Sequence, residues 1–236
     1  MRVLVTLPTY NEAENIGRLL DQLLAVHPGL EVLVVDDDSP DGTWKIVEER
    51  AAAESRVHLL RRTHERGRGT AGRDGFRWAV EHGAEFVVEM DADFSHHPRY
   101  IPPLIEAAEQ GADLVIGSRL VSGGGEVGRG LLRPLITKAA NLYIRTVLWL
   151  RVRDCTSGYR LYRGALLARI PWDRVESRGP EIVQETLLWA RALGAQIVEV
   201  PILFEERAAG QSTFNIRIMR RSLLAILRFR LRRFRV

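Results

Sequence analysis

Short apolar runs alternate along the first half of this chain with longer segments in which apolar residues recur every three or four positions. The short runs are rich in valine, leucine and isoleucine and predict buried β-strands at residues 2–7, 30–35, 57–60, 86–90 and 114–116. The segments between them have helical spacing and predict α-helices at residues 11–25, 43–53, 70–82 and 100–109. This alternation of strand and helix predicts an α/β fold, with a mostly parallel, Rossmann-like sheet flanked by helices.

The pattern changes after residue 118. Residues 122–130 contain five glycines in nine positions, which predicts a mobile loop of the kind that forms lids and binding loops. Beyond it, helical spacing returns at residues 131–150 and 181–193, and an apolar run at 197–204 predicts a further strand. Pro201 has no backbone N–H to donate, so we expect this strand at an edge of the sheet.

The C-terminal segment differs from the rest of the chain in charge. Residues 217–236 contain eight arginines and no acidic residue, so this segment carries +8 and the remainder −4, which together give the net charge of +4. From residue 214 the arginines intermix with apolar residues at helical spacing: Leu223, Leu224, Ile226, Leu227, Phe229, Leu231 and Phe234. We therefore expect two parts, an α/β domain at residues 1–210 and a basic amphipathic helix at residues 211–236.

A basic amphipathic helix of this kind is typical of a segment that lies on an anionic membrane surface. The same pattern also fits an ordinary helix that packs on the body of the protein or on a second subunit. A nucleic-acid-binding module would use the same arginines, but the acidic body of the chain argues against that reading. Of these partners we expect a membrane surface and no nucleic acid.

Composition places the chain among ordinary globular proteins. It has 236 residues, of which 46% are hydrophobic and 27% charged, enough for a core in one α/β domain. Cys155 is its single cysteine, which excludes an intrachain disulfide. The N-terminal run is broken by Pro8 too early for a signal peptide, and no apolar run approaches the roughly 18 residues of a membrane span. We expect a cytoplasmic protein, or a peripheral one on the cytoplasmic face of a membrane.

Two carboxylates follow the strand expected at residues 86–90. Asp91 and Asp93 lie one residue apart at its C-terminal end, the edge at which open α/β sheets bind ligands. Their oxygens suit Mg²⁺ or Mn²⁺ bridging a diphosphate, and Ser95 offers a weaker third oxygen. An Asp-x-Asp pair is also common in turns and helix caps, so the pair alone does not decide between a metal site and a turn.

Two other predicted strands end in acidic or aromatic loops. Residues 8–12 read Pro-Thr-Tyr-Asn-Glu, in which Tyr10 offers an aromatic face to a base and Glu12 a carboxylate to its edge or to a ribose. Residues 36–38 are three adjacent aspartates, which repel one another and are not expected for stability alone. Together with the Asp91 and Asp93 pair, these strand ends predict a nucleotide site combined with a metal site.

Residues 67–72 match the G-x-G-x-x-G pattern of dinucleotide-binding loops. That fingerprint belongs in the first strand-to-helix turn, which here is the glycine-free segment at residues 8–12. We therefore interpret the glycines as a tight helix entrance near a phosphate or a sugar.

Arginines in or near the expected loops are candidate partners for phosphate, since a guanidinium group can bind phosphate oxygens through two hydrogen bonds. They are Arg119, Arg133, Arg160, Arg163 and Arg207. Arg133 stands out because Thr137 lies four residues further along at the start of an expected helix, so the two side chains share a face near its N-terminus. That arrangement predicts a cradle for an acceptor phosphate.

Seven segments together resemble one known family of enzymes. They are PTYNE (8–12), VDDDSPDGT (35–43), RGRGTAGRDG (66–75), EMDADFSHHP (89–98), GSR (117–119), DCTSGYRLYR (154–163) and VPILFEER (200–207). In content and order they resemble the family 2 glycosyltransferases with the GT-A fold, and within these the dolichol- and polyprenyl-phosphate mannose synthases.

The resemblance implies a role for each matching residue. The nucleotide of GDP-mannose would contact Pro8, Tyr10, Glu12, Val35 and Asp37. The metal and the diphosphate would be held by Asp91, Ala92 and Asp93, with Ser95 at the position of a third metal ligand. The donor diphosphate would be bound by Arg119 and Arg207, and the lipid phosphate by Arg133 and Thr137. Asp93, Arg119 and Arg133 would be the catalytic residues, and Mg²⁺ or Mn²⁺ the cofactor.

The implied reaction is metal-dependent transfer of mannose from GDP-mannose to a polyprenyl or dolichyl monophosphate, with inversion at C1 of the sugar. Some positions depart from the family pattern: Thr213 stands where lysine is usual, residues 179–183 replace an aromatic stretch that ends in glutamine, and the usual tryptophan near Gly128 is absent. These departures leave open a polyprenyl-phosphate glucose synthase, or another family 2 transferase that uses a UDP-sugar.

Overall fold

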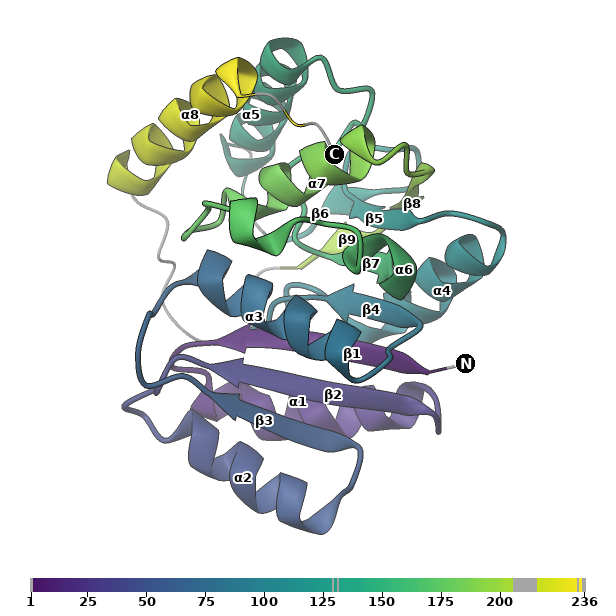
Figure 1. Ribbon diagram of the computed structural model, residues 1–236, viewed down its shortest axis with the longest axis vertical. Helices are drawn as coiled ribbons and strands as arrows, with labels where there is room; N and C mark the ends of the chain where they lie inside the picture. Colours follow the sequence, from purple (N-terminus) through teal and green to yellow (C-terminus); the bar gives the residue numbers. More distant parts are fainter. Residues whose placement is uncertain (1, 129, 131, 206–215, 233, 235–236) are drawn as a thin grey trace.

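Seven strands form the larger sheet of this protein, which is described from a computed structural model (Figure 1). The structure describes residues 2–128, 130, 132–205, 216–232 and 234, with the side chains of the last helix from Arg221 onward. The strands are β1 (Val3–Thr9), β2 (Leu30–Asp36), β3 (Val57–Arg61), β4 (Phe86–Glu89), β5 (Leu114–Ser118), β7 (Arg160–Arg163) and β8 (Ile197–Pro201). Their order is β3-β2-β1-β4-β7-β5-β8, in which β7 runs antiparallel to both neighbours and the other pairs are parallel.

The register of the parallel strands brings three strand ends to one edge of the sheet. Thr9 at the end of β1 pairs with Asp36 at the end of β2, and Thr6 of β1 pairs with Glu89 at the end of β4. The loops that follow these strands therefore begin side by side. This confirms the prediction that the acidic and aromatic loops share one edge.

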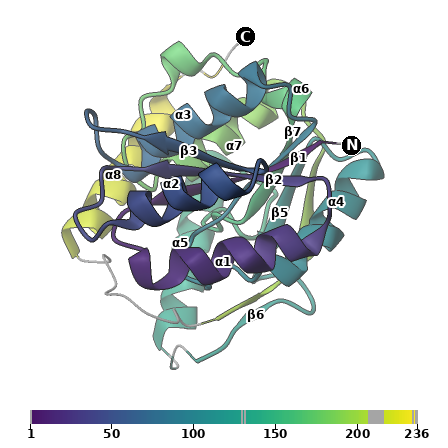
Figure 2. The same ribbon diagram turned by 90° about the horizontal axis from the view of Figure 1, so that it is seen from below.

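Helices cover both faces of the sheet (Figure 2). On one face lie α1 (Ala13–Val26), α2 (Thr43–Ala53), α4 (Ile101–Glu109) and the short 3₁₀ helix η1 (Pro98–Tyr100). On the other lie α3 (Arg68–Glu81), α6 (Gly164–Leu167), α7 (Ile182–Ala192) and the 3₁₀ helix η2 (Trp172–Arg174). Strand residues alternate between the two cores, since Val3 and Val5 belong to the first and Leu4 to the second. The three-layer α/β fold is the one the sequence predicts.

The first helix illustrates how the apolar spacing builds these layers. Ile16, Leu19, Leu20 and Leu23 recur every three or four residues along α1 and are fully buried against the sheet. Burying each side chain of this size stabilises the fold by about 1.5–3 kcal/mol. Glu14 lies in the first turn, where the helix dipole favours a negative charge.

The strand β7 is absent from the set that the apolar pattern predicts. Its four residues, Arg-Leu-Tyr-Arg, begin and end with arginine, so the run resembles a loop in the sequence. Arg160 is nevertheless completely buried, because its guanidinium donates to the backbone carbonyls of Ser157, Val183 and Cys155. Arg160 and Arg163 thus lie at the two ends of a strand that directly follows a loop, and Arg160 has protein carbonyls as partners where a phosphate was considered.

The strand predicted at residues 197–204 is in fact two strands. After β8 ends, β9 (Leu203–Phe204) pairs with β6 (Gly125–Glu126) in a separate two-stranded sheet. β8 lies at the edge of the large sheet, as Pro201 predicts. β6 falls within the glycine-rich segment that was expected to be a loop, so part of that segment is joined to the body by backbone hydrogen bonds.

Two further helices, α5 (Leu132–Leu148) and α8 (Ile216–Leu231), lie beside each other at one end of the molecule, at the top in Figure 1. Ile226 and Phe229 of α8 are buried in the core that α7 also joins, so α8 packs on the body of the protein. The helix predicted beyond residue 214 is confirmed, whereas the boundary expected between residues 210 and 211 falls outside the described residues. Over the described part of the chain, no helix combines the length and apolar character that a membrane span requires.

Candidate active site

Three residues with left-handed backbones mark the ligand edge of the sheet. Asn11, Asp38 and Phe94 have φ angles of 61°, 55° and 64°, and they follow β1, β2 and β4 respectively. Asparagine and aspartate tolerate this conformation, but a bulky residue such as Phe94 is strained in it. Phe94 lies between Asp93 and Ser95, so the turn that carries the acidic pair holds backbone strain of the kind found at functional sites.

The outer two of the three aspartates after β2 have different partners. Asp36 is fully buried and accepts hydrogen bonds from the Ser39 N–H, the Ser39 hydroxyl and the Thr9 hydroxyl at 2.8, 2.7 and 2.8 Å. It therefore ties the loop after β1 to the loop after β2. Asp38 lies at the rim, where two hydrogen bonds from the Arg61 guanidinium, at 2.6 and 2.8 Å, hold the pKa of Asp38 below its usual range.

Asp37, which was expected at the nucleotide, takes part in a buried ion pair. Its Oδ1 lies 2.5 Å from Nη1 of Arg62, and its Oδ2 accepts a hydrogen bond of 2.7 Å from the Gly67 N–H. Burial raises the pKa of Asp37, although the Gly67 N–H and the Arg62 charge act in the opposite direction. Arg62 also pairs with Asp74 of α3 at 2.9 Å. Asp37 thus joins its loop to the start of α3, and its contact with a nucleotide stays a prediction.

The other residues expected at the nucleotide lie together at the ends of β1 and β2. Pro8 pairs with Val35 in the sheet, and Tyr10 and Glu12 follow on the loop after β1. Tyr10 is 50% exposed, and the Arg66 guanidinium carbon lies 5.9 Å from its ring centre, which leaves part of the ring accessible to a stacking partner. The Glu12 N–H donates to the Thr43 hydroxyl at 2.9 Å, which holds this loop against the start of α2.

Asp91 and Asp93 differ in exposure. Asp93 is buried, and its Oδ1 accepts hydrogen bonds from the Ser95 N–H at 3.1 Å and from the Ser95 hydroxyl at 2.6 Å. Ala92 is buried between the two, whereas the Asp91 side chain is 37% exposed. The Asp91 N–H donates to Nδ1 of His96 at 3.0 Å, so the ring proton of neutral His96 is on Nε2. Ser95 orients Asp93 by these two bonds, and its place as a third metal ligand stays a prediction.

A partly buried ion pair next to the two aspartates was not predicted from the sequence. Glu89, the last residue of β4, is buried and binds Nη1 of Arg68 at 2.6 Å, while Nη2 of Arg68 lies 3.4 Å from Asp91. Burial would lower the pKa of Arg68, but the charges of Glu89 and Asp91 raise it, so the guanidinium remains charged. Both residues of the pair lie in or next to motifs that the sequence analysis singled out. Arg68 is part of the G-x-G-x-x-G pattern, and Glu89 lies two residues before Asp91.

The donor atoms at this edge fit a hard divalent cation that shares its ligands with a diphosphate. Asp91 and Asp93 supply carboxylate oxygens, the type of ligand that Mg²⁺ and Mn²⁺ prefer. Within the described residues, no group of three or more His, Cys, Asp or Glu side chains is placed to hold a metal ion by itself. Mg²⁺ typically takes one or two carboxylates and completes its coordination with waters and substrate phosphates, so two carboxylates at an open sheet edge match its needs.

Gly67 and Gly69 are required by a neighbouring chain segment. Gly67 has a φ of 143°, and a Cβ there would lie 2.6 Å from the Arg178 carbonyl oxygen. A Cβ on Gly69 would lie 2.6 Å from the Ser177 carbonyl oxygen, and the Gly69 N–H donates to the Arg178 carbonyl at 3.0 Å. α3 begins at Arg68, which confirms the tight helix entrance. Close backbone packing explains these glycines, and their expected contact with a phosphate or a sugar stays a prediction.

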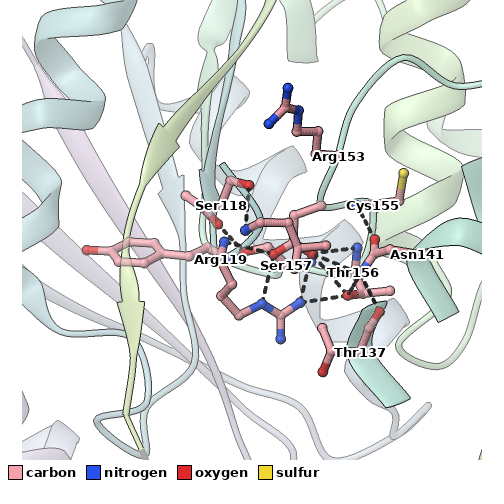
Figure 3. Close-up of polar contacts among 12 residues, drawn as sticks. Ser118, Arg119, Thr137, Asn141, Arg153, Cys155, Thr156 and Ser157 are labelled. Carbon is pink, nitrogen blue, oxygen red and sulfur yellow. Dashed lines mark hydrogen bonds and ion pairs between the residues drawn. The ribbon is translucent and has the colours of Figure 1, made fainter. Parts of the chain in front are cut away.

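Arg119 follows β5 and forms a bidentate ion pair with Asp154. Its Nε and Nη2 lie 2.8 Å from Oδ2 and Oδ1 of Asp154. Nη2 also donates to the Thr156 hydroxyl at 2.6 Å (Figure 3). Burial would raise the pKa of Asp154, but the hydrogen bonds and charge of Arg119 outweigh it and lower that pKa. Nη1 of Arg119 lies 3.7 Å from Glu126. The contact of Arg119 with the donor diphosphate stays a prediction. No role was predicted for Asp154, although it lies in a segment that matches the family.

Arg133 and Thr137 lie in the first turns of α5, as predicted. Arg133 is exposed, and the Thr137 hydroxyl donates to the Arg133 carbonyl at 3.0 Å. One turn further along, the buried Asn141 lies against Thr156, next to Arg119 (Figure 3). The helix of the predicted acceptor site is thus in contact with the Arg119 region. Two positions named in the sequence analysis lie outside the described residues. They are Arg207, which was expected to bind the donor diphosphate, and Thr213, which stands where the family usually has lysine.

Solved structures with the same fold are glycosyltransferases. The chain is similar to glucosyl-3-phosphoglycerate synthase from Mycobacterium tuberculosis, solved with Mn²⁺, UDP-glucose and phosphoglyceric acid, with a TM-score of 0.71 at 23% identity over 97% of this chain and 79% of that one. The structure of the same enzyme with UDP gives a TM-score of 0.68 at 24% identity, with the same coverage of both chains. The fold is therefore the GT-A fold of glycosyltransferases, as the sequence predicts.

The sequence comparison then defines the family: the chain matches Glycosyl transferase family 2 over residues 4–170 and belongs to it. It is 45% identical over 229 residues to Undecaprenyl-phosphate mannosyltransferase from Micrococcus luteus, covering 97% of this chain and 94% of that protein. It is 41% identical over 234 residues to Polyprenol monophosphomannose synthase from Mycolicibacterium smegmatis, covering 98% and 88%. With Dolichol-phosphate mannosyltransferase from Pyrococcus furiosus the identity is 39% over 216 residues, covering 90% and 59%. The protein is an enzyme that transfers glycosyl groups, and the family predicted from its motifs is confirmed.

Proposed function

We propose that this enzyme transfers mannose from GDP-mannose to the phosphate of a polyprenyl or dolichyl monophosphate, with inversion at C1 and with Mg²⁺ or Mn²⁺ as cofactor. Support comes from three relatives at 45%, 41% and 39% identity, which are named for mannose and for undecaprenyl phosphate, polyprenol or dolichol phosphate. The observation that carries the proposal is the position of Arg133 and Thr137, since they lie on one helix together with exposed apolar side chains.

The acceptor joins a phosphate to a long apolar chain, and α5 offers partners for both. Arg133 is exposed at the start of the helix, where its guanidinium can bind phosphate and the helix dipole favours a negative charge. Leu132, Leu135 and Ile136 beside it are 75%, 61% and 49% exposed. Apolar side chains so exposed next to a phosphate cradle suit a phosphate that is attached to a lipid better than a free one.

We place the same end of the molecule on a membrane surface, at its cytoplasmic face. The exposed face of α8 combines apolar with basic side chains: Leu224, Leu227, Leu231, Arg221, Arg228 and Arg230. Arg230 lies 4.1 Å from the ring centre of the exposed Trp149 at the end of α5, so the faces of the two helices adjoin. Such a surface is typical of helices in the interface of an anionic bilayer. The unpaired thiol of Cys155 fits the reducing cytoplasmic side.

The donor would lie along the edge formed by β1, β2 and β4. Pro8, Tyr10 and Glu12, with Val35 and Asp37, would contact its base and ribose, and the exposed ring of Tyr10 supports this assignment. Next to them, the diphosphate would lie between the acidic pair and the arginines.

Asp91 and Asp93 would hold the divalent cation, with Ala92 between them and Ser95 beside Asp93. A solved enzyme of the same fold contains Mn²⁺ together with its nucleotide sugar. When bound, the cation offsets negative charge on the leaving diphosphate. Arg68 places a further positive charge beside Asp91, and we assign Arg119 and Arg207 to the same diphosphate.

The acceptor phosphate needs no dedicated general base. A phosphate monoester has a second pKa of about 6, so it is mostly ionised at neutral pH. Its oxygen forms the new bond to C1 of mannose while the bond from C1 to the donor diphosphate breaks. The task of the protein is to hold two negatively charged partners close together, with Arg133 on the acceptor side and Arg119 on the donor side.

The proposal is tested by transfer from labelled GDP-mannose to a polyprenyl phosphate, with the full chain and with or without Mg²⁺ or Mn²⁺. We expect a lipid-linked mannose product that forms only when the cation is present. UDP-glucose and UDP-N-acetylglucosamine serve as parallel donors. Product from a UDP-sugar but not from GDP-mannose would show that the donor sugar is not mannose. No product from any donor would overturn the proposal.

A further inference from the structure

Asn141 connects the helix of the acceptor site to the ion pair of Arg119. Its Oδ1 accepts a hydrogen bond from the Cys155 N–H at 2.6 Å, and its Nδ2 donates to the Thr137 carbonyl at 2.9 Å and to the Thr156 hydroxyl at 3.0 Å. Figure 3 shows these partners on either side of the Asn141 amide. Because its carbonyl oxygen faces an N–H and both of its amide protons face oxygens, the orientation of the amide is determined by its surroundings.

The hydroxyl of Thr156 connects Asn141 of α5 to Arg119. It accepts hydrogen bonds from Nδ2 of Asn141 at 3.0 Å and from Nη2 of Arg119 at 2.6 Å, and it donates to Oδ1 of Asp154 at 3.1 Å. A hydroxyl has one proton to donate and two lone pairs, so its hydrogen-bonding capacity is full. A shift of α5 relative to Arg119 must therefore stretch or break one of these bonds.

The segment that contains Thr156 is itself fixed to the sheet. The backbone N–H groups of Arg153 and Asp154 donate to the Glu199 carboxylate of β8 at 2.8 and 2.9 Å. The Ser157 hydroxyl donates to the Gly117 carbonyl of β5 at 2.5 Å. Asp154, Cys155 and Ser157 of this segment are buried, while Thr156 and Glu199 are half-buried. Polar networks whose groups have partners hold one arrangement, so this segment gives α5 a rigid point of attachment.

We propose that Asn141 is a positioning residue, which sets the place of Arg133 and Thr137 relative to Arg119 and thereby the approach of the acceptor phosphate to the donor sugar. The inference rests on the proposed function, because it takes Arg119 as a donor-side group and Arg133 as an acceptor-side group. Asn141 is buried and acts through α5 and Thr156. A displacement of about 1 Å between reacting groups can cost about a hundredfold in rate, so the effect belongs in kcat.

Asn141→Leu tests this by keeping the size of the side chain and removing its hydrogen bonds. We expect kcat with polyprenyl phosphate to fall by about tenfold or more, while the Kd for GDP-mannose, from calorimetry with Mn²⁺, changes by less than about twofold. Thr146→Ala is the matched control, because the exposed Thr146 donates to the Leu142 carbonyl at 2.8 Å on the same helix and lies outside the network. It should keep the kcat of the wild type.

Thr156 gives a second pair of variants, which decides the question if Asn141→Leu does not fold. Thr156→Val keeps the shape and removes the hydroxyl, whereas Thr156→Ser keeps the hydroxyl. We expect kcat to fall in the valine variant and to be restored in the serine variant. The melting temperature of each variant is measured so that kcat refers to folded enzyme.

A wild-type kcat in folded Asn141→Leu, or equal kcat in the valine and serine variants of Thr156, would overturn the inference. Loss of donor binding as large as the loss of kcat would also overturn it, since the network would then serve the donor site alone. Absence of product from the wild-type protein would instead overturn the proposed function, and this inference with it. The two kinds of failure are therefore distinguishable.

Discussion

The guanidinium of Arg119 and the carboxylate of Asp154 face each other in a bidentate ion pair, with both nitrogen–oxygen distances at 2.8 Å. The two residues are 35 positions apart, and the pair joins the end of β5 to the segment before β7. Both side chains are buried, so water does not replace a missing partner. Removing either charge leaves the other inside the protein without its nearest partner.

Asp154→Asn should lower the free energy of unfolding by as much as about 3–5 kcal/mol, because it leaves the buried Arg119 charge with only the more distant Glu126 carboxylate, 3.7 Å from its Nη1. Urea unfolding at neutral pH measures this loss. Asp21→Asn is the matched control, since Asp21 pairs with Arg50 at 2.8 Å on the surface with its side chain 59% exposed. An exposed pair contributes at most about 1 kcal/mol, so comparable losses in the two variants would contradict this account.

The stabilisation by Asp154 should also depend on pH. Its pKa is lowered in the folded protein, whereas an unfolded aspartate has a pKa of about 3.9. Its contribution is therefore complete above about pH 4 and is lost as the pH falls through the lowered pKa of the folded state. The difference in unfolding free energy between wild type and Asp154→Asn should be constant at mildly acidic to neutral pH and shrink below about pH 4. Urea titrations across this range check it, and a difference that grows in acid would be inconsistent with the lowered pKa.

Asp93→Ala should abolish mannosyl transfer and also the Mn²⁺-dependent part of GDP binding, because it removes a carboxylate of the proposed cation site. Calorimetry of GDP binding with and without Mn²⁺ measures the loss of Mn²⁺-dependent binding and does not require turnover. Ser95→Ala removes the hydroxyl that donates to Asp93 at 2.6 Å but keeps both carboxylates, so a smaller loss is expected. Near-normal transfer by Asp93→Ala in the presence of metal would rule out this cation site.

Arg133→Ala should raise the KM for polyprenyl phosphate by about tenfold or more, since hydrogen bonds to a charged group contribute about 1.5–3 kcal/mol. The Kd for GDP-mannose should stay close to the wild-type value. Lys138→Ala removes another exposed positive charge from the same helix and serves as the control for net charge. Steady-state kinetics with varied acceptor, together with measurements of donor binding, distinguishes effects on the two sites. An equal loss of acceptor affinity and donor affinity would show that Arg133 does not act at the acceptor site alone.

Replacing Leu224 and Leu227 together by serine should weaken binding to vesicles of anionic phospholipid, because both side chains are exposed on α8 and would be buried in the bilayer interface. Co-sedimentation with vesicles measures the effect. Leu203→Ser, at an exposed position on β9, provides the control. Unchanged vesicle binding would leave α8 as a helix that packs on the body or on a second subunit, which sedimentation velocity would then examine.

Much of the fold was predictable because its signals are local. The pattern of a buried strand or of an amphipathic helix can be recognised within about ten residues. All strands of the large sheet except β7 were therefore predicted from the apolar pattern. Parallel strands place their C-terminal ends at one edge, which is why Asp37, Asp91 and Tyr10 could be assigned to one site before any contact was known. β7 was not predicted because its terminal arginines obscure the strand pattern. Arg160 is buried there because carbonyls of the preceding segment and of α7 accept its hydrogen bonds.

The sequence by itself determined the α/β fold, the family and the acidic edge of the sheet, since these depend on local periodicity and on the direction of parallel strands. Only the tertiary structure decided which charges already have partners. Arg68 lies against Glu89, Arg62 against Asp37 and Arg119 against Asp154, and these pairs join residues 21, 25 and 35 positions apart. Whether an arginine meets a protein carboxylate or a substrate phosphate depends on distance and on removal from water, and both are set only when the chain has folded.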